Sequence, residues 1–204
     1  MRAPYAAGVS DEDLVRRLRA GDESAFSEVI NAYHPSMVRL AMSFVPSRAV
    51  AEDVAQDTWL AVLRGIDNFE GRSSLKTWIF HILANRARST GVREQRSLAV
   101  DLGDEASVDR RRFDEKGAWS DPPAPWSDEI VERLSSGPFL AQVQEAISRL
   151  PDAQRAVVTL RDLDGLSNKE VCDVLGISEA NQRVLLHRGR SRIRAIFEDE
   201  VVKR

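Results

Sequence analysis

The stretch SNKEVCDVLGISEANQRVLLHRGRSRIR, residues 167–194, is the most informative part of this chain. Ser167 and Glu170 form the S-x-x-E pattern of a capping box, which begins a short helix with valine and leucine on its inward side. Gly176 suits the left-handed turn that ends such a helix, and Ser178 can cap the helix that follows. A short helix, a glycine turn and a long basic helix in this order predict a helix-turn-helix.

The second of these helices has a basic side and an apolar side. At about 100° of rotation per residue, arginines line one side, and the opposite arc holds Leu186, Gly189, Ile193 and Ile196. In a helix-turn-helix the first turns of the second helix enter the major groove. The residues expected to read base edges there are Asn181, Arg183, Val184, His187 and Arg188. Those expected to bind phosphates are Arg190, Arg192 and Arg194. A helical hairpin with a solvated basic face is the alternative.

The net charge of −3 does not exclude a nucleic-acid partner, because the charges are unevenly distributed. Residues 72–96 carry 6 basic and 1 acidic side chains, and residues 183–194 carry five arginines and no acid. Attraction to phosphate is screened over roughly 8 Å at physiological salt, so local clusters matter more than the sum. Two basic clusters on two helices favour binding to nucleic acid.

Composition excludes several other classes of function. Cys172 is the only cysteine, and the three histidines have no metal-ligand spacing, so neither a disulfide nor a metal or other cofactor is expected. The chain has no apolar run of 18 residues, which argues against membrane insertion and for a cytoplasmic protein. It also lacks P-loop glycines and a paired nucleophile and base, so the sequence predicts that it is not an enzyme.

Helical periodicity divides the chain into two blocks, residues 10–96 and residues 139–204. Neither block has a strand pattern, so we predict an all-α fold of two small helical domains. Residues 97–138 are acidic and rich in proline and serine, which predicts an extended, partly disordered linker. Within it, Trp119 and Trp126 are expected to dock on a partner. Residues 1–9 are expected to be disordered.

Breakers and caps predict where the helices of the first block begin and end. Asp22 is expected to cap the second helix, and Pro35 to kink or divide it. The third and fourth helices are predicted over about Val50–Gly65 and Leu75–Arg93, with the polar loop Asp67–Ser74 between them.

The third predicted helix has an acidic face with an apolar residue in the middle. Asp53, Gln56 and Asp57 share one side, and Leu60 lies among them rather than with the apolar residues opposite. This combination suits docking on a protein surface with basic edges. Single exposed leucines are common, so a solvated face is the alternative.

The loop and the fourth helix combine hydrogen-bonding groups, arginines and aromatics, which suits single-stranded DNA. A role on duplex DNA or a purely structural role is the alternative. The candidate contacts in the loop are Asn68, Phe69, Arg72 and Ser73. Those in the helix are Thr77, His81, Asn85 and Arg88.

Taken together, the segments Ala51–Arg88, Leu150–Ser178 and Leu185–Arg194 resemble the extracytoplasmic-function group (group IV) of bacterial sigma-70 family sigma factors. The resemblance covers nearly all of residues 10–200. It implies that the first block is a sigma-two domain and the second a sigma-four domain with a helix-turn-helix.

The resemblance also implies partners and roles. The helix with Asp53, Gln56 and Asp57 would bind the clamp coiled coil of core RNA polymerase, and the flap is a further expected contact on the polymerase. The loop Asn68–Ser74 would capture a base flipped from the promoter −10 element, and the helix Thr77–Arg88 would contact the same element. The sigma-four domain would read the −35 element, the linker would thread the polymerase, and an anti-sigma factor would sequester the free protein.

Two positions depart from the family pattern. Gln182 stands where family members commonly have a valine facing the core, which predicts either a buried hydrogen bond or a slightly rotated helix. Asp57 replaces the more frequent glutamate and keeps the charge.

Two rival interpretations involve no polymerase-directed promoter recognition. One is a stand-alone helix-turn-helix regulator, which would bind operator DNA tightly without polymerase. The other is an adaptor that binds another protein through Asp53, Asp57 and Leu60. Basic clusters in both blocks favour the sigma-factor interpretation over the stand-alone regulator.

Overall fold

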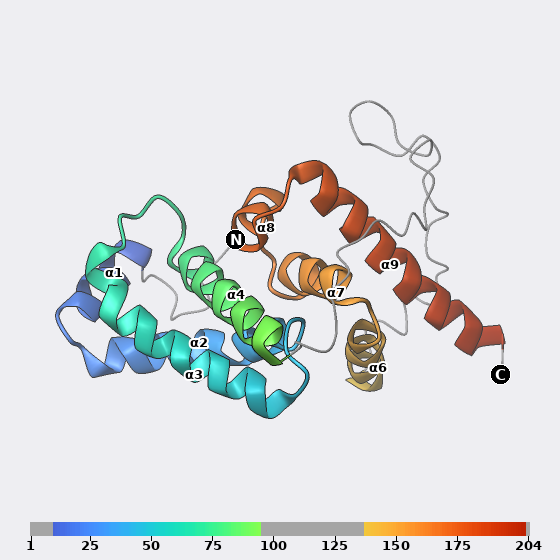
Figure 1. Cartoon of the computed structure of the whole chain (residues 1–204), viewed down its shortest axis with the longest axis horizontal. Helices are drawn as coiled ribbons and strands as arrows, with labels where there is room; N and C mark the ends of the chain where they lie inside the picture. Colours follow the sequence, from blue (N-terminus) through green and yellow to red (C-terminus); the bar gives the residue numbers. More distant parts are fainter. Residues whose placement is uncertain (1–9, 95–136, 203–204) are drawn as a thin grey trace. The chain divides into compact units, whose positions relative to one another are not determined.

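The computed structural model describes residues 10–94 and 137–202, and the regular elements in both ranges are helices (Figure 1). They are α1 (Asp11–Arg19), α2 (Glu23–Ala41), α3 (Arg48–Gly65), a 3-10 turn (Ile66–Asn68), α4 (Leu75–Glu94), α6 (Gly137–Ser148), α7 (Asp152–Val158), a π-helical turn (Thr159–Leu163), α8 (Asn168–Leu175) and α9 (Glu179–Val202). The predicted all-α fold is confirmed. The predicted disordered start, nearly all of the predicted linker, and Trp119 and Trp126 lie outside the described residues.

Contacts divide the chain into two compact units. Among the described residues, the first contains residues 10–94 together with Thr159–Ile177, and the second contains residues 137–158 and 178–202. The first unit therefore includes α8, which the sequence assigned to the second domain. The domain boundaries 10–96 and 139–204 stay a prediction.

Side-chain caps fix the beginnings of the helices in the first unit. Asp22 accepts hydrogen bonds from the backbone of Ser24 and Ala25, as predicted, and begins α2. Pro35, which was expected to kink or divide the helix, lies inside α2 without dividing it, because α2 runs unbroken from Glu23 to Ala41. Tyr33 and Met37, on either side of Pro35, are buried.

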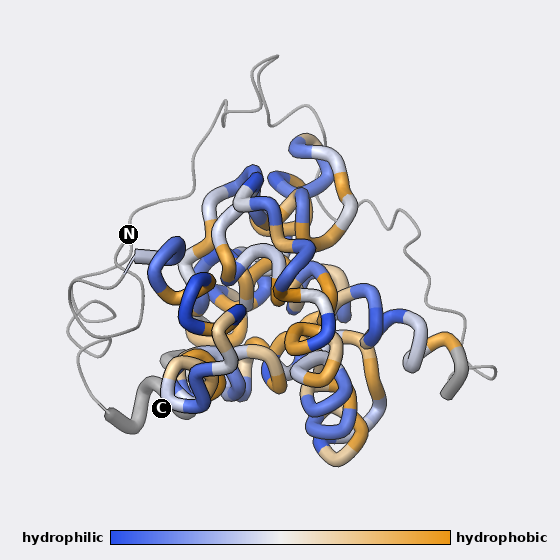
Figure 2. Tube along the Cα trace, turned by 90° about the vertical axis from the view of Figure 1, so that its left-hand side faces the viewer, coloured by the Kyte–Doolittle hydropathy of each residue, from blue (hydrophilic) through white to orange (hydrophobic). Residues whose placement is uncertain are grey.

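The core of the first unit lies among α2, α3 and α4, which pack on one another (Figure 1). Hydrophilic and hydrophobic residues alternate along the chain (Figure 2), and most of the large apolar residues of α2, α3 and α4 are buried. Tyr33 of α2 meets Phe80 of α4 edge to face, with ring centroids 6.2 Å apart. The ammonium group of Lys76 lies 5.8 Å and 5.5 Å from the centroids of the same two rings.

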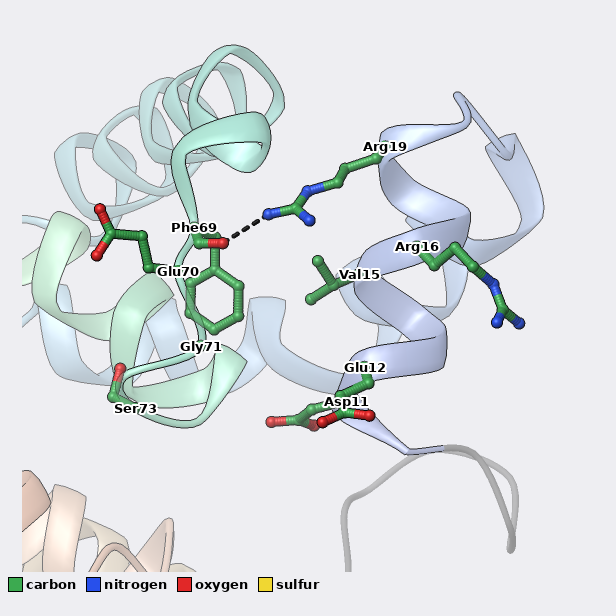
Figure 3. A pocket seen from close by; sticks show the side chains of 9 residues that line it. All are labelled: Asp11, Glu12, Val15, Arg16, Arg19, Phe69, Glu70, Gly71 and Ser73. Atoms are coloured by element: carbon green, nitrogen blue, oxygen red, sulfur yellow. Dashed lines mark hydrogen bonds between the residues drawn. The ribbon is translucent and has the colours of Figure 1, made fainter.

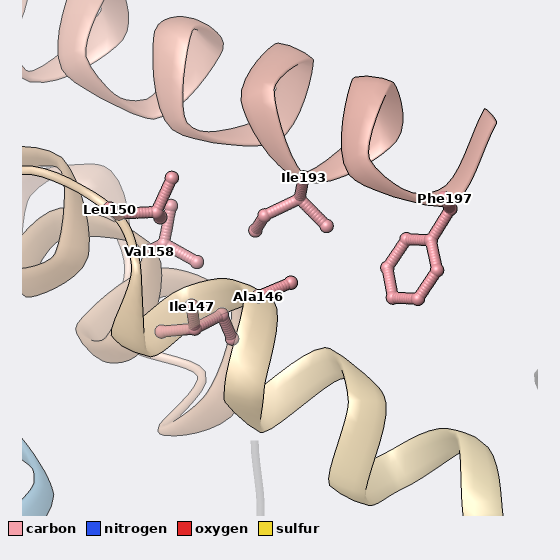
Figure 4. Close-up of a cluster of buried hydrophobic side chains, with 6 residues drawn as sticks. All are labelled: Ala146, Ile147, Leu150, Val158, Ile193 and Phe197. Atoms are coloured by element: carbon pink, nitrogen blue, oxygen red, sulfur yellow. The ribbon is translucent and has the colours of Figure 1, made fainter. Parts of the chain in front are cut away.

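The core of the second unit is a cluster contributed by α6, α7 and α9 (Figure 4). Its buried members are Ala146, Ile147, Leu150, Val158, Ile193 and Phe197. Gly189 of α9 lets this helix approach α7 closely, because a Cβ there would lie 2.6 Å from Cγ2 of Val158. The apolar arc predicted for the second helix of the helix-turn-helix is thus the side that packs into this core.

The local structure predicted for the helix-turn-helix is present along the chain. Ser167 and Glu170 form the reciprocal capping box at the start of α8. Gly176 ends α8 in the left-handed conformation, with φ of +64°, which L side chains rarely adopt. The Ser178 side chain accepts a hydrogen bond from the Asn181 backbone at the start of α9.

Candidate protein and nucleic-acid interfaces

The acidic face predicted on α3 is exposed to solvent. Asp53, Gln56, Asp57 and Leu60 are all exposed, and Leu60 retains 50% of its accessible surface. The opposite side of α3 is buried through Ala51, Val54, Ala55, Thr58, Trp59 and Val62. One helix thus has an apolar side in the core and an acidic side with a leucine facing outward.

Leu63 belongs to the same face and was not predicted from the sequence. It is 48% exposed, and at about 100° per residue it lies on the same side of the helix as Gln56, about two turns further along. Extending the helical projection by one turn would have found it. We call Asp53, Gln56, Asp57, Leu60 and Leu63 the acidic leucine face.

A hollow of about 490 Å³ lies between α3 and α4. Val54 and Asp57 of α3 line it on one side, and residues of α4 including Asn85 and Arg86 line it on the other. The hollow brings Asp57, predicted to bind protein, next to Asn85, predicted to bind DNA.

The loop between α3 and α4 presents only part of its predicted set to solvent. Asn68 and Arg72 are exposed, and Ser73 is half-buried. Phe69 is 8% exposed, and its ring centroid lies 5.2 Å from that of Trp78 in α4. Phe69 therefore shapes the loop from inside, and a direct contact of its ring with a base stays a prediction.

Helix α1 forms one side of a pocket of about 550 Å³ whose other side is the loop (Figure 3). Arg19 of α1 points at the loop and donates a hydrogen bond of 2.6 Å to the carbonyl oxygen of Phe69. Asp11, at the other end of α1, accepts a hydrogen bond of 2.9 Å from the Leu75 backbone at the start of α4. Sequence reasoning missed both residues, because their partners lie about 50 or more positions away in the chain and no local motif marks either of them.

The polar stripe of α4 is partly exposed and partly occupied by α8. His81 and Asn85 are exposed. Thr77 is 2% exposed and donates a hydrogen bond of 2.9 Å to Glu170 of α8. Arg88 donates one of 2.6 Å to the carbonyl oxygen of Leu175, at the end of α8. In this arrangement α8 covers Thr77, whereas Arg88 is half-buried, and the role of both residues in DNA binding stays a prediction.

Hydrogen bonding and burial shift the pKa values of two ionisable groups in this contact, Glu170 and Arg88. Burial alone would raise the pKa of the Glu170 carboxyl, but hydrogen bonds from Ser167, Thr77 and Ser74 outweigh it and hold that pKa below its usual value. Burial lowers the pKa of the Arg88 guanidinium, which nevertheless stays protonated at neutral pH. The contact therefore joins a carboxylate on α8 to hydroxyl donors from the loop and α4.

A second long-range contact joins α2 and α4 to the turn before α8. The side chain of Asp164 is 2% exposed, and one of its oxygens lies 3.1 Å from Nη2 of Arg39. Lys76 donates a hydrogen bond of 2.6 Å to the backbone oxygen of Asp164. Burial lowers the pKa of Lys76, and the nearby carboxylates of Asp164 and Glu170 act against that effect.

The residues predicted on α9 differ in exposure. Asn181, Arg183 and Arg190 are exposed, and the others are half-buried. The half-buried ones are Val184, His187, Arg188, Arg192 and Arg194. Arg192 donates a hydrogen bond of 3.2 Å to Gln154 of α7, so its guanidinium is turned partly toward the protein. A phosphate contact by Arg192 stays a prediction.

Gln182 is fully buried in the second unit. Neither its amide nitrogen nor its amide oxygen has a hydrogen-bond partner among the described residues. The side chain thus faces the interior, as the position predicts, without the buried hydrogen bond that was one expected solution.

Within residues 10–94 and 137–202, no group of three or more histidine, cysteine, aspartate or glutamate side chains is arranged to hold a metal ion. In the same two ranges no helix is long and apolar enough to cross a membrane.

Comparison with known proteins agrees with this layout of helices. The family model for sigma-70 region 2 matches residues 29–97, and the model for sigma-70 region 4 matches residues 140–193. The extracytoplasmic-function RNA polymerase sigma-E factor of Salmonella typhimurium is 29% identical over 185 residues, which are 91% of this chain and 93% of that protein.

Two solved structures share the fold. The first is CnrH in complex with the cytosolic domain of CnrY, with a TM-score of 0.58 at 22% identity over 93% of this chain and 97% of that one. The second is the sigma factor RpoE of Bartonella quintana in complex with the anti-sigma factor NepR, with a TM-score of 0.58 at 23% identity over 85% of this chain and 96% of that one. At these identities the likeness concerns the fold.

The described residues form helices only, and α8 and α9 supply the successive elements of a helix-turn-helix, which is the layout expected of a DNA-binding protein and agrees with the match to sigma-70 region 4. The chain belongs to the sigma-70 family, in its extracytoplasmic-function class, a family that directs RNA polymerase to promoters and is not one of catalytic enzymes.

Proposed function

We propose that this chain binds core RNA polymerase through the acidic leucine face, directs it to promoters with two recognition elements, and promotes their melting. The observation that carries the proposal is that every residue predicted on that face of α3 is exposed while the other side of the helix is buried. Exposed leucines among carboxylates fit a partner with an apolar centre and basic edges.

The loop after α3 and the stripe on α4 would then contact the −10 element, and the first turns of α9 would read the −35 element. Holding both regions on one polymerase makes the second DNA contact effectively intramolecular, so two weak contacts become a specific one. Unstacking a base costs a few kcal/mol, which a base held at the loop would partly offset. The polymerase carries out the bond-forming chemistry, and the chain itself acts as a cytoplasmic protein without catalytic activity.

An anti-sigma factor is the second partner that we propose. The solved neighbours were obtained in complex with CnrY and with the anti-sigma factor NepR, which supports a partner of this kind. Such an inhibitor would compete with core polymerase for the free protein.

Transcription in vitro with purified core polymerase tests the function. We expect initiation at a cognate promoter only when the chain is present. A chain that fails to bind polymerase yet binds operator DNA tightly by itself would instead be a stand-alone regulator.

Two sets of variants separate the proposed roles. Asp53→Ala combined with Asp57→Ala should weaken binding to core polymerase, because the face loses its carboxylates. Arg183→Ala combined with Arg188→Ala should weaken only recognition of the upstream element. Pull-down on polymerase and promoter footprinting measure the two effects, and equal losses in both assays for both variants would contradict this division.

A further inference from the structure

Helix α1 contacts the loop between α3 and α4 near its beginning and at its end. Arg19, in the last turn of α1, donates hydrogen bonds to the carbonyl oxygens of Ile66 at 3.2 Å, Phe69 at 2.6 Å and Asp67 at 3.4 Å. Asp11, in the first turn, accepts a hydrogen bond from the backbone nitrogen of Leu75, the first residue of α4. The two ends of one helix thus hold the two ends of the loop.

The three carbonyls bound by Arg19 converge on one guanidinium. A carbonyl oxygen accepts a hydrogen bond more strongly from a charged donor than from a neutral one, and the planar guanidinium can serve several acceptors at once. The side chain of Phe69 is held from the inner side by Trp78, at 5.2 Å between ring centroids. The path of the loop is therefore set from two directions before any ligand arrives.

The part of the loop that is not held in this way is the part that faces solvent. Asn68 and Arg72 are exposed, and Arg72 pairs with Glu70 at 3.0 Å, with both side chains largely in solvent. Asn68 and Arg72 belong to the loop whose backbone Arg19 and Asp11 hold. Other residues of this loop, among them Glu70 and Ser73, line the pocket between α1 and the loop (Figure 3).

We propose that Arg19 and Asp11 are positioning residues for promoter opening, which act on DNA through the loop and not by touching it. This inference rests on the proposed function, in which the loop receives an extruded base. A pre-shaped loop receives a base without first paying the entropy of ordering its own backbone. Without these contacts the loop would adopt many paths, and its preference for one base would fall.

The test uses the full chain with core polymerase and two promoters, one intact and one with an abasic site at the extruded position. Opening is followed by 2-aminopurine fluorescence in the −10 element. The wild-type protein should open the intact promoter faster. Arg19→Ala should open the intact promoter about tenfold more slowly, as expected for the loss of hydrogen bonds from a charged donor, and should no longer distinguish the two promoters. Arg19→Lys, which keeps one charged donor, should show an intermediate preference.

Arg16→Ala is the matched control, because Arg16 lies one turn earlier on the same helix and, although it also lines the pocket, pairs with Asp13 and turns its guanidinium away from the loop (Figure 3). It should behave as the wild type. Asp11→Ala provides an independent variant at the other end of the loop and should also lose the preference. Binding to core polymerase should persist in all of them, which shows that the variants are folded.

The outcomes separate the inference from the function on which it rests. If Arg19→Ala and Asp11→Ala slow opening of both promoters equally and keep the full preference for the intact one, α1 is merely structural and the inference is wrong. If the wild-type protein itself does not distinguish the two promoters, the loop does not receive a base, and the proposed role of the loop fails together with the inference.

Discussion

Gln182 places an amide group in an apolar interior. The side chain is fully buried, and both amide atoms lack a hydrogen-bond partner among the described residues. An unpaired buried polar group costs about 1–3 kcal/mol, because it loses water and gains nothing in return. We therefore expect Gln182→Leu to increase the free energy of unfolding by about 1–3 kcal/mol, measured by urea denaturation.

The control for this change is Gln144→Leu, because Gln144 is an exposed glutamine on α6 of the same unit. Its replacement should leave the free energy of unfolding within about 0.5 kcal/mol of the wild-type value. A Gln182→Leu protein that is no more stable than the wild type would show that the amide is satisfied in solution, for instance by water.

Asp22 links stability to pH. Hydrogen bonds from Ser24, Arg17 and the Ala25 backbone hold the pKa of the Asp22 carboxyl well below its usual value. A carboxyl whose pKa is lower in the folded state stabilises the fold above its unfolded pKa, and this contribution disappears as the pH falls through the folded value. Thermal unfolding should therefore show a smaller loss of stability on acidification for Asp22→Asn than for the wild type. Glu23→Gln, at the exposed neighbouring position, is the control and should lose as much stability on acidification as the wild type.

At the scale of single residues, the sequence predicted caps well and pairings poorly. Asp22, Ser167 and Ser178 were identified as caps because a cap acts on backbone groups two or three positions away. Gln182 was predicted to face the core from its place on the helix. Whether a partner for its amide lay nearby depended on residues distant in the sequence, and no local pattern reports that.

At the scale of an element, the residues on the exposed side of α3 form one continuous candidate docking surface. Leu60 and Leu63 are half-exposed and lie on the same face as Asp53, Gln56 and Asp57. If this face docks on polymerase, each leucine becomes buried on binding, and burying a leucine contributes about 1.5–3 kcal/mol. We expect Leu63→Ser to weaken binding to core polymerase about tenfold or more.

Fluorescence anisotropy of the labelled chain against core polymerase measures this effect. Val92→Ser is the matched control, since Val92 is an apolar residue of α4 that is 66% exposed. A Leu63→Ser protein that binds polymerase as tightly as the Val92→Ser protein would place Leu63 outside the interface.

Helix bounds were largely predictable, since amphipathic periodicity and breakers act within one element. The third helix was expected from about Val50 and begins at Arg48, where Ser47 caps it. The exception in the first block is Pro35, which α2 tolerates because the buried residues around it hold the helix together. Whether the helix continues through Pro35 depends on tertiary packing, which the presence of a proline in the sequence does not report.

For the molecule as a whole, the distribution of charge matters more than the net charge of −3. Arg190 is exposed on α9, beyond the turns expected to read bases. A phosphate contact releases counterions, so each one steepens the salt dependence of binding by about 0.9 in log–log slope for duplex DNA. In the polymerase complex, Arg190→Ala should weaken binding to cognate and unrelated promoters alike and reduce this slope by about 1.

Arg183→Ala, at an exposed position in the first turns of α9, should instead reduce the preference for the cognate −35 element. Filter binding at several salt concentrations distinguishes the two variants. If Arg190→Ala leaves the slope unchanged, Arg190 does not contact phosphate.

Contacts between residues far apart in the chain were beyond the sequence. Arg39 and Asp164 form an ion pair although 125 positions separate them in the sequence. Thr77 donates a hydrogen bond to Glu170, which lies 93 positions further along. Thr77 had been interpreted as a DNA contact, and the capping box explained Glu170 from its neighbours. No local pattern marked Arg39 or Asp164. The assignment of α8 to the first unit depends on such pairs, which is why the predicted domains and the observed units divide the chain differently.

The hold of Arg19 on the loop is made through carbonyl oxygens, which every amino acid carries. The path of the loop backbone therefore does not depend on which side chains stand at outward positions such as Asn68 and Arg72. Mutation can therefore exchange those side chains without changing the backbone path of the loop. If the loop contacts the promoter as proposed, promoter preference can therefore be altered by one surface substitution at a time.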